Sequence, residues 1–264
     1  MKPAKDHRDR VITGLVGLII VFLVVNYGSK LVFFIFIFLL NFFALREFYH
    51  LASINRNNRW LGMGLGIGLT TIFFNLENPA FFGLIFGIVI LYCLFQIINF
   101  KQPEPISSNF KKHLTVSFIV FFLSHLLWLR ELSGGHLWIF FILSVAFSGD
   151  TFAFYGGKLL GKHKLSVKIS PGKTIEGAIL GLLGSVGIGY LFTFLFFPKF
   201  ARLNVICLTV ILGVLSQLGD LWESVLKRKA MVKDSGRLLP GHGGILDRVD
   251  SLFFSVPFLY YFIK

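Results

Sequence analysis

The stretch GAILGLLGSVGIGYLFTFLFFP, at residues 177–198, contains no charged side chain. About 20 apolar residues in a helix span the hydrocarbon core of a bilayer, so this stretch predicts a transmembrane helix. Similar uncharged stretches follow one another along the rest of the chain, and we therefore predict an all-α polytopic membrane protein with about nine transmembrane helices. The other stretches are residues 11–29, 31–45, 60–76, 78–100, 114–129, 132–149, 203–219 and 251–263.

The composition of the whole chain agrees with this class. Of the 264 residues, 55% are hydrophobic and only 15% are charged, and the mean hydropathy is +0.75. A soluble domain carries about 25% charged residues. The composition therefore excludes a disordered chain, a secreted disulfide scaffold and an ordinary soluble enzyme. The two cysteines, Cys93 and Cys207, lie in apolar stretches and give no basis for a disulfide or a zinc site.

The distribution of basic residues predicts the direction of the chain in the membrane. The formal net charge is +13, and with a cytoplasmic N-terminus 21 of the 26 Lys and Arg residues fall on the cytoplasmic side. Basic residues gather in the cytoplasmic loops of membrane proteins. We therefore predict a cytoplasmic N-terminus and a C-terminus on the opposite side. Residues 1–136 would form a first membrane region of five spans, and residues 137–264 a second region of four spans.

Glycines at helical spacing predict close contacts between helices. Gly62, Gly64, Gly66 and Gly68 form two overlapping pairs four residues apart, and Gly177 and Gly181 form another such pair. Small residues at this spacing let the backbones of two transmembrane helices approach each other. The pattern fits packing within the chain and packing in a homodimer equally well.

The acidic residues are concentrated in the second region. Seven of the 13 Asp and Glu residues fall between residues 150 and 250, all at predicted cytoplasmic helix ends or in the loops between them. Ionisable groups at membrane depth are costly and usually functional. Asp150 lies inside the sixth predicted helix, because that helix must extend to about Gly157 to cross the bilayer. Its carboxylate would bind a cation or pair with a polar group on a neighbouring helix.

Two further carboxylates are expected on neighbouring helices. Residues 251–263 would cover only about 20 Å, so the ninth helix must begin near Ile245 to cross about 30 Å. Asp247 and Asp250 then share a face of its first turns. Asp220 ends the eighth span and has Glu223 and Ser224 on the same side. A meeting of Asp220 with Asp247 would suit Mg²⁺, and pairing of these carboxylates with Arg248 is the alternative.

Two loops predicted to be cytoplasmic are basic, at residues 158–177 and 223–248. The first contains Gly172-Lys173-Thr174, which is no P-loop because Val167 stands where that pattern needs glycine. Its cations, glycines and hydroxyls suit a triphosphate, and equally an anionic lipid surface. In the second loop, Gly243-Gly244 opens the predicted ninth helix and would expose backbone N–H groups to an anion. His242 beside them would be a functional group or a packed side chain.

Residues 224–250, which we call the signature segment, resemble the signature of the phosphatidate cytidylyltransferase (CDP-diglyceride synthetase) family. The resemblance extends to Gly149-Asp150 and to residues 170–177, where Ile175 departs from the usual Trp. The first five spans are similar to the family only in hydropathy. The matching residues of the signature segment are Ser224, Leu226, Lys227, Arg228, Lys233, Asp234, Gly236, Leu239, Pro240, His242, Gly243, Gly244, Ile245, Asp247, Arg248, Val249 and Asp250.

The resemblance implies that CTP and phosphatidic acid react to give CDP-diacylglycerol and pyrophosphate, with Mg²⁺ or with Mg²⁺ and a second cation. Residues 137–264 would be the catalytic region. The implied metal ligands are Asp220 and Asp247, followed by Asp250 and Asp150. Phosphate groups would be held by Lys227, Arg228, Lys233 and Arg248, and the nucleotide by Ser170, Lys173, Ser224, Gly243 and Gly244, with Asp234 and His242 completing the set.

The same resemblance implies an integral protein of a bacterial cytoplasmic (inner) membrane, with its active site facing the cytoplasm and no nucleic acid as partner. Two alternatives are weaker. A different lipid-phosphate transferase, such as a polyprenol kinase, disagrees with the full match of the signature segment. A transporter or channel disagrees with the gathering of the carboxylates on one side and with the lack of a sequence repeat.

Overall fold

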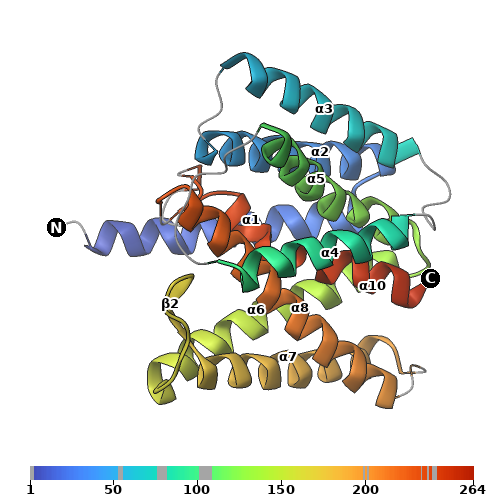
Figure 1. Cartoon of the computed structure of the whole chain (residues 1–264). Helices are drawn as coiled ribbons and strands as arrows, with labels where there is room; N and C mark the ends of the chain where they lie inside the picture. Colours follow the sequence, from blue (N-terminus) through green and yellow to red (C-terminus); the bar gives the residue numbers. More distant parts are fainter. Residues whose placement is uncertain are drawn as a thin grey trace. The chain divides into compact units, whose positions relative to one another are not determined.

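The computed structural model describes residues 3–52, 56–75, 82–100, 109–198, 200, 202–232, 234–236, 238–239 and 243–264. These residues are mostly helical, as predicted, with one small two-stranded hairpin (Figure 1). The long helices correspond one to one to the first eight uncharged stretches. They are α1 (Pro3–Tyr27), α2 (Lys30–Leu51), α3 (Arg56–Asn75), α4 (Phe82–Ile98), α5 (Asn109–Glu131), α6 (Gly135–Leu160), α7 (Ile175–Phe196) and α8 (Arg202–Lys229).

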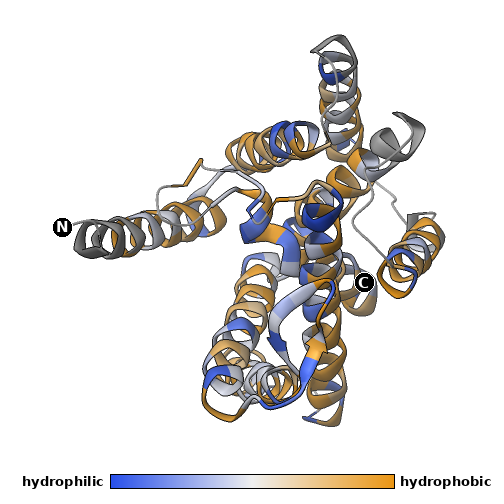
Figure 2. Cartoon of the chain, turned by 60° about the vertical axis from the view of Figure 1, so that its left-hand side comes forward, coloured by the Kyte–Doolittle hydropathy of each residue, from blue (hydrophilic) through white to orange (hydrophobic). Residues whose placement is uncertain are grey.

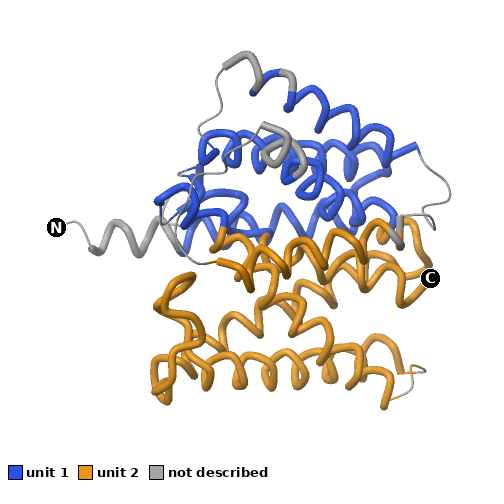
Figure 3. The backbone as a smooth tube through the Cα atoms, in the orientation of Figure 1, with its two compact units in different colours: residues 1–77, 103–128, 226–249 blue, residues 78–102, 129–225, 250–264 orange. Residues whose placement is uncertain are grey.

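The chain divides into two compact units that alternate along the sequence (Figure 3). Unit 1 comprises residues 1–77, 103–128 and 226–249, and unit 2 comprises residues 78–102, 129–225 and 250–264. The predicted division at residue 136, into a first membrane region of five spans and a second, catalytic region of four spans, stays a prediction.

Several helices have the length and composition needed to cross a membrane. Among the described residues, α2, α6, α7 and α8 meet both requirements, and shorter apolar helices lie within α1, α3 and α4. Figure 2 shows that hydrophobic residues predominate along the helices. Large apolar side chains are exposed on them, for example Ile19, Leu183 and Leu203. Such surfaces are suited to contact with lipid. The number of nine spans and their orientation stay predictions.

The ninth predicted helix is not continuous. The segment from Ile245 onward forms a short helix α9 (Leu246–Val249), a 3₁₀ turn η1 (Asp250–Leu252) and the helix α10 (Ser255–Ile263). Pro257 lies in the first turn of α10, where its missing N–H group is tolerated. A helix continuing from the residues before it would be interrupted at this position, because proline has no N–H to donate. Nine residues of helix cover only about 14 Å, so α10 is shorter than the bilayer core.

A small hairpin interrupts the otherwise helical chain within the first basic loop. Strand β1 (Lys164–Ser166) pairs antiparallel with β2 (Ser170–Thr174), and Ser166 lies opposite Ser170. Thr174 then caps α7, because its hydroxyl accepts the N–H of Gly177 at 3.1 Å. The sequence predicted a loop here and not strands, since two strands of this length leave no recognisable alternation.

In unit 2, α6 and α7 pack with their backbones in close contact. A Cβ atom on Gly181 would lie 2.8 Å from the carbonyl oxygen of Gly149 and 2.9 Å from Cβ of Ala153. A Cβ atom on Gly177 would lie 2.7 Å from the carbonyl oxygen of Ala153. The prediction of a close contact at Gly177 and Gly181 is therefore confirmed, and the partner is a helix of the same chain.

The predicted close helix contact at the glycines of α3 is confirmed only in part. A Cβ atom on Gly66 would lie 2.3 Å from Cδ1 of Leu45 on α2, whereas nothing lies within 4 Å of one on Gly64 or Gly68. Only Gly66 of these three therefore brings α3 close to α2 within unit 1.

The α6–α7 contact predicts a stability difference between two glycine variants of one helix. Gly181→Val would place a branched side chain against α6, and overpacking of this kind costs about 1–3 kcal/mol. Gly187→Val makes the same change where nothing lies within 4 Å. We expect the thermal unfolding midpoint in detergent to fall by several degrees for the first variant relative to the second. Equal midpoints would contradict the close packing of α6 on α7.

Candidate active site

A cavity in unit 2 contains four of the residues that the sequence predicted as functional. It has a volume of about 460 Å³ and lies among α6, the β1–β2 hairpin, α7 and α8. Its lining includes polar side chains from three of these elements: Asp150 and Lys158 on α6, Ser170 and Lys173 on β2, and Gln217 and Asp220 on α8. The structure thus brings Asp150, Ser170, Lys173 and Asp220 to one space.

The hairpin that carries Ser170 and Lys173 is fastened at its base by Glu176. The Glu176 carboxylate accepts the backbone N–H of Lys162 at 3.0 Å and that of His163 at 3.2 Å, and it contacts Nδ1 of His163 at 2.6 Å. In addition, the N–H of Ile175 donates to the carbonyl oxygen of His163. The end of α6 is thereby joined to the start of α7, and the hairpin lies at the cavity.

Lys173 and Asp220 form an ion pair across the cavity. The ammonium of Lys173 contacts Oδ2 of Asp220, and both side chains are less than one third exposed. Gln217, one turn earlier on α8, donates from Nε2 to the carbonyl oxygen of Ala178 at 2.9 Å and so fixes α8 against α7. The sequence predicted Lys173 as a nucleotide ligand and Asp220 as a metal ligand, and the structure shows that the two side chains can meet.

Asp220 also belongs to a group of three carboxylates in unit 2. One oxygen each from Asp220, Glu223 and Asp250 lies within 4.8 Å of the others, and Glu223 and Asp250 are buried. The backbone of α8 approaches η1 closely, because a Cβ atom on Gly219 would lie 2.3 Å from the carbonyl oxygen of Asp250. The sequence predicted Asp220 and Asp250 as metal ligands, whereas Glu223 was expected only to lie on the same side as Asp220.

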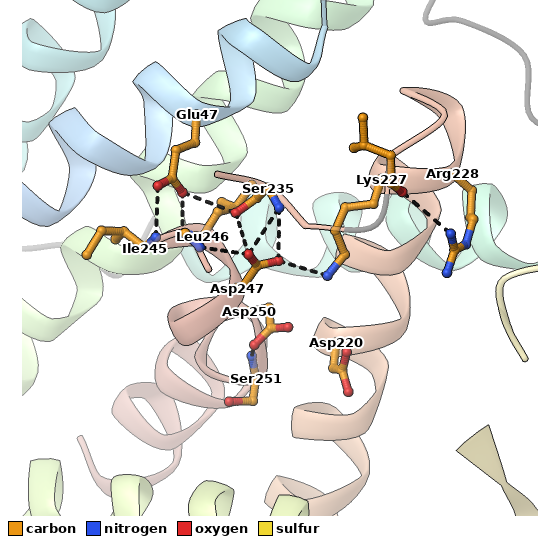
Figure 4. A network of polar contacts seen from close by, with 12 residues as sticks. Glu47, Asp220, Lys227, Arg228, Ser235, Ile245, Leu246, Asp247, Asp250 and Ser251 are labelled. Atoms are coloured by element: carbon orange, nitrogen blue, oxygen red, sulfur yellow. Dashed lines mark hydrogen bonds and ion pairs between the residues drawn. The ribbon is translucent and has the colours of Figure 1, made fainter. Parts of the chain in front are cut away.

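A second polar network lies in unit 1 around Asp247 (Figure 4). Lys227 Nζ contacts Asp247 Oδ1 at 2.9 Å, in a pair that is at most 15% exposed. Oδ2 accepts the N–H of Gly244 at 2.9 Å and the hydroxyl of Ser235 at 2.9 Å, and the N–H of Ser235 also donates to this carboxylate. Lys227 and Asp247, predicted separately as phosphate and metal ligands, therefore form an ion pair.

The predicted joint site of Asp220 and Asp247 is not tested by this geometry. Asp247 lies in unit 1, whereas Asp220 and Asp250 lie in unit 2. Each set of contacts stands within its own unit. A metal site that includes both aspartates therefore stays a prediction.

Glu47 on α2 joins the network of unit 1 and was missed in the sequence. Its carboxylate is buried and accepts the N–H of Ile245 at 3.0 Å and that of Leu246 at 2.9 Å (Figure 4). The N–H groups that follow Gly243-Gly244 thus have carboxylate acceptors from the protein, and the N–H of Gly244, in the stretch that the sequence predicted for an anion, donates to Asp247. The available signal was a single acidic residue near the end of a mostly apolar helix.

The remaining predicted residues occupy varied surroundings. Ser224 is buried on α8, Asp234 and Arg248 are exposed, and Nη1 of Arg228 donates to the carbonyl oxygen of Val232 at 3.5 Å. Gly243 adopts φ +83°, a conformation that favours glycine, and its carbonyl oxygen accepts the N–H of Leu239. Lys233 and His242 lie outside the described residues.

Comparison with known proteins identifies relatives along nearly the whole chain. Residues 8–264 match the model of the Cytidylyltransferase family. The phosphatidate cytidylyltransferase of Bacillus subtilis is 32% identical over 98% of both chains, and that of Staphylococcus haemolyticus is 50% identical over 48% of this chain and 49% of its own. The uncharacterized protein YnbB of Escherichia coli is 35% identical over 94% of this chain and 84% of its own.

The clamp at the base of the hairpin predicts a local change in hydrogen exchange. Glu176→Gln removes the charge that receives the N–H groups of Lys162 and His163, so these amides should exchange several-fold faster. Hydrogen–deuterium exchange followed by mass spectrometry measures this on peptides covering residues 160–176. Glu131→Gln, the same change at the end of α5, should leave these peptides unchanged. Identical exchange in both variants would show that Glu176 does not hold the hairpin.

Proposed function

Since this chain belongs to the cytidylyltransferase family, we propose that it is an integral membrane phosphatidate cytidylyltransferase. The reaction joins CTP and phosphatidic acid into CDP-diacylglycerol and releases pyrophosphate. The observation that carries the proposal is the match, over nearly all of both chains, to a relative of that name. The cavity of unit 2 supports it, because cationic and acidic side chains face one space there.

The chemistry requires two anions to be brought together. An oxygen of the lipid phosphate attacks the α-phosphorus of CTP, and pyrophosphate leaves. Catalysis of such transfers is mostly positioning and neutralisation of charge, so no nucleophile from the protein is needed. Lys158 and Lys173 supply positive charge to the cavity, and Ser170 supplies a hydroxyl. We propose that these residues bind the triphosphate.

The carboxylates of unit 2 fit a divalent cation. Asp220, Glu223 and Asp250 offer three hard oxygen donors within 4.8 Å of one another, a donor set that suits Mg²⁺. A bound Mg²⁺ would supply Lewis-acid neutralisation of the triphosphate and of the leaving pyrophosphate. Asp150, which lines the cavity of unit 2, is proposed as a further ligand there, and Asp247 of unit 1 is proposed as a ligand of a second cation.

In the signature segment, the basic residues are proposed to hold phosphate groups. Lys227 is already oriented by Asp247 in unit 1. Arg228, Lys233 and Arg248 are assigned to the nucleotide or lipid phosphate. Ser224, Asp234, His242, Gly243 and Gly244 are assigned to positioning of the nucleotide within the same segment.

The location of the reaction follows from its substrates. CTP is soluble and phosphatidic acid is held in the bilayer, so a site at the cytoplasmic interface of the membrane serves both. We propose nine membrane-crossing segments, the ninth being the broken segment of α9, η1 and α10 rather than one continuous helix. We also propose a cytoplasmic N-terminus and residence in a bacterial cytoplasmic membrane. A homodimer is compatible with the open surroundings of Gly64 and Gly68 and stays a prediction.

The proposal predicts a metal-dependent reaction that fails when a proposed ligand is changed. Purified protein in detergent, with phosphatidic acid, labelled CTP and Mg²⁺, should form CDP-diacylglycerol and pyrophosphate. EDTA should abolish the product, and Asp220→Asn and Asp247→Asn should each lower kcat/KM by at least about 100-fold, because charge neutralisation is the main catalytic contribution. Product analysis by chromatography measures both effects.

Matched reactions exclude the alternatives. Glu131→Gln, at the end of α5, should retain full turnover. Labelled ATP in place of CTP should give no phosphorylated lipid, whereas a lipid kinase would produce it. Absence of CDP-diacylglycerol from folded protein with several acyl chains would overturn the assignment of phosphatidic acid as substrate.

A further inference from the structure

Glu47 links α2 to the signature segment through two backbone hydrogen bonds. It lies in the last turns of α2 and is 8% exposed, and all of its contacts described here are within unit 1. Oε1 accepts the N–H of Ile245 at 3.0 Å, and Oε2 accepts that of Leu246 at 2.9 Å. The two oxygens therefore fix the orientation of the turn that leads into Asp247 (Figure 4).

Ser235 connects the Glu47 carboxylate to that of Asp247. Its hydroxyl lies 3.2 Å from Oε2 of Glu47 and 2.9 Å from Oδ2 of Asp247, and the residue is 1% exposed. One hydroxyl proton can be donated to only one of two carboxylates at a time. The position of Glu47 therefore influences how Ser235 meets Asp247. Together with the N–H of Gly244, these contacts determine where the oxygens of Asp247 lie.

Two glycines of the signature segment leave room for the Glu47 carboxylate. A Cβ atom on Gly236 would lie 2.6 Å from Oε1 of Glu47. A Cβ atom on Gly244 would lie 2.3 Å from Oε2 of Glu47 and 2.2 Å from the hydroxyl oxygen of Ser235. Positions 236 and 244 can therefore accommodate the Glu47 carboxylate only because glycine has no side chain there.

Burial of this carboxylate is costly unless charge-assisted hydrogen bonds offset the loss of hydration. Three such contacts are present, from Ile245, Leu246 and Ser235, and each leads to the turn that carries Asp247. We propose that Glu47 is a positioning residue that sets the orientation of Asp247 through this turn and through Ser235. The inference rests on the proposed function, in which Asp247 takes part in the transfer of the cytidylyl group.

The test uses the full-length protein in detergent and separates kcat from KM. Glu47→Gln keeps the shape, but its amide can present an acceptor to only one of the two N–H groups and turns an NH₂ group toward the other. Small displacements of catalytic groups cost up to about 100-fold in rate. We expect kcat to fall at least about tenfold while the KM for CTP changes less than about twofold and the thermal midpoint stays near that of the wild type.

A double-mutant cycle tests the route through Ser235. Ser235→Ala alone should also lower kcat, and Ser235→Ala combined with Glu47→Gln should cost much less than the product of the two single effects, because both act on Asp247. If the loss of kcat in the double variant equals the product of the two single losses, the two residues act independently, and the proposed route is overturned. A merely structural Glu47 would lower the yield of folded protein and leave kcat per folded molecule unchanged, which would also overturn it.

A glycine pair provides a variant that keeps Glu47 itself. Gly236→Ala places a methyl group against the Glu47 carboxylate, whereas Gly68→Ala places the same group where nothing lies within 4 Å. Loss of kcat in the first and not in the second supports the proposal, also where Glu47→Gln does not fold. Equal kcat in both variants overturns it. Failure of the proposed function is distinguishable, because the wild-type protein would then form no CDP-diacylglycerol at all.

Discussion

The backbone contact between α6 and α7 is the constraint on which the cavity of unit 2 depends. Lipid chains are as apolar as the helices, so the hydrophobic effect does little to drive transmembrane helices together. They associate instead through close packing and interhelical hydrogen bonds. Both are present here: the glycines at 149 and 181 allow the contact, and the hydroxyl of Ser185 donates to the carbonyl oxygen of Val145. With α6 and α7 held together, the chain between them is confined to a hairpin at their common end. Lys173 on that hairpin consequently reaches Asp220.

The carboxylates of the two units differ in their arrangement. In unit 1, the oxygens of Glu47 and Asp247 receive backbone N–H groups, the Ser235 hydroxyl and the Lys227 ammonium. In unit 2, one oxygen each from three carboxylates lies within 4.8 Å of the others, while Asp220 also pairs with Lys173 and Asp250 accepts the N–H of Ser251. Three hard oxygen donors at these distances suit a divalent cation. We therefore propose the metal primarily at Asp220 and its neighbours and a positioned, ion-paired role for Asp247.

The sequence predicts the features that arise from residues close together in the chain better than those that arise from residues far apart. Uncharged stretches gave eight helices, and the spacing of Gly177 and Gly181 gave the contact with α6, since both are local features. The hairpin was missed because its strands are short. The prediction of a continuous ninth helix was wrong, because a hydropathy pattern does not register the effect of Pro257 on the backbone. Glu47 was missed for a different reason: it acts on backbone N–H groups 198 and 199 residues away, and backbone donors leave no trace in side-chain patterns.

The place of Glu47 also gives a physical reason for glycines that a sequence pattern only records. Gly236 and Gly244 are fixed positions of the signature segment, and neither has a positive φ that would by itself require glycine. What each position lacks is space for a Cβ atom, and the atoms that fill this space include the carboxylate oxygens of Glu47. The signature segment therefore does not form this arrangement by itself. Its turn, its two glycines and Ser235 form one packed arrangement with a side chain from α2, so the N-terminal part of the chain contributes to the geometry of the residue proposed to act in catalysis.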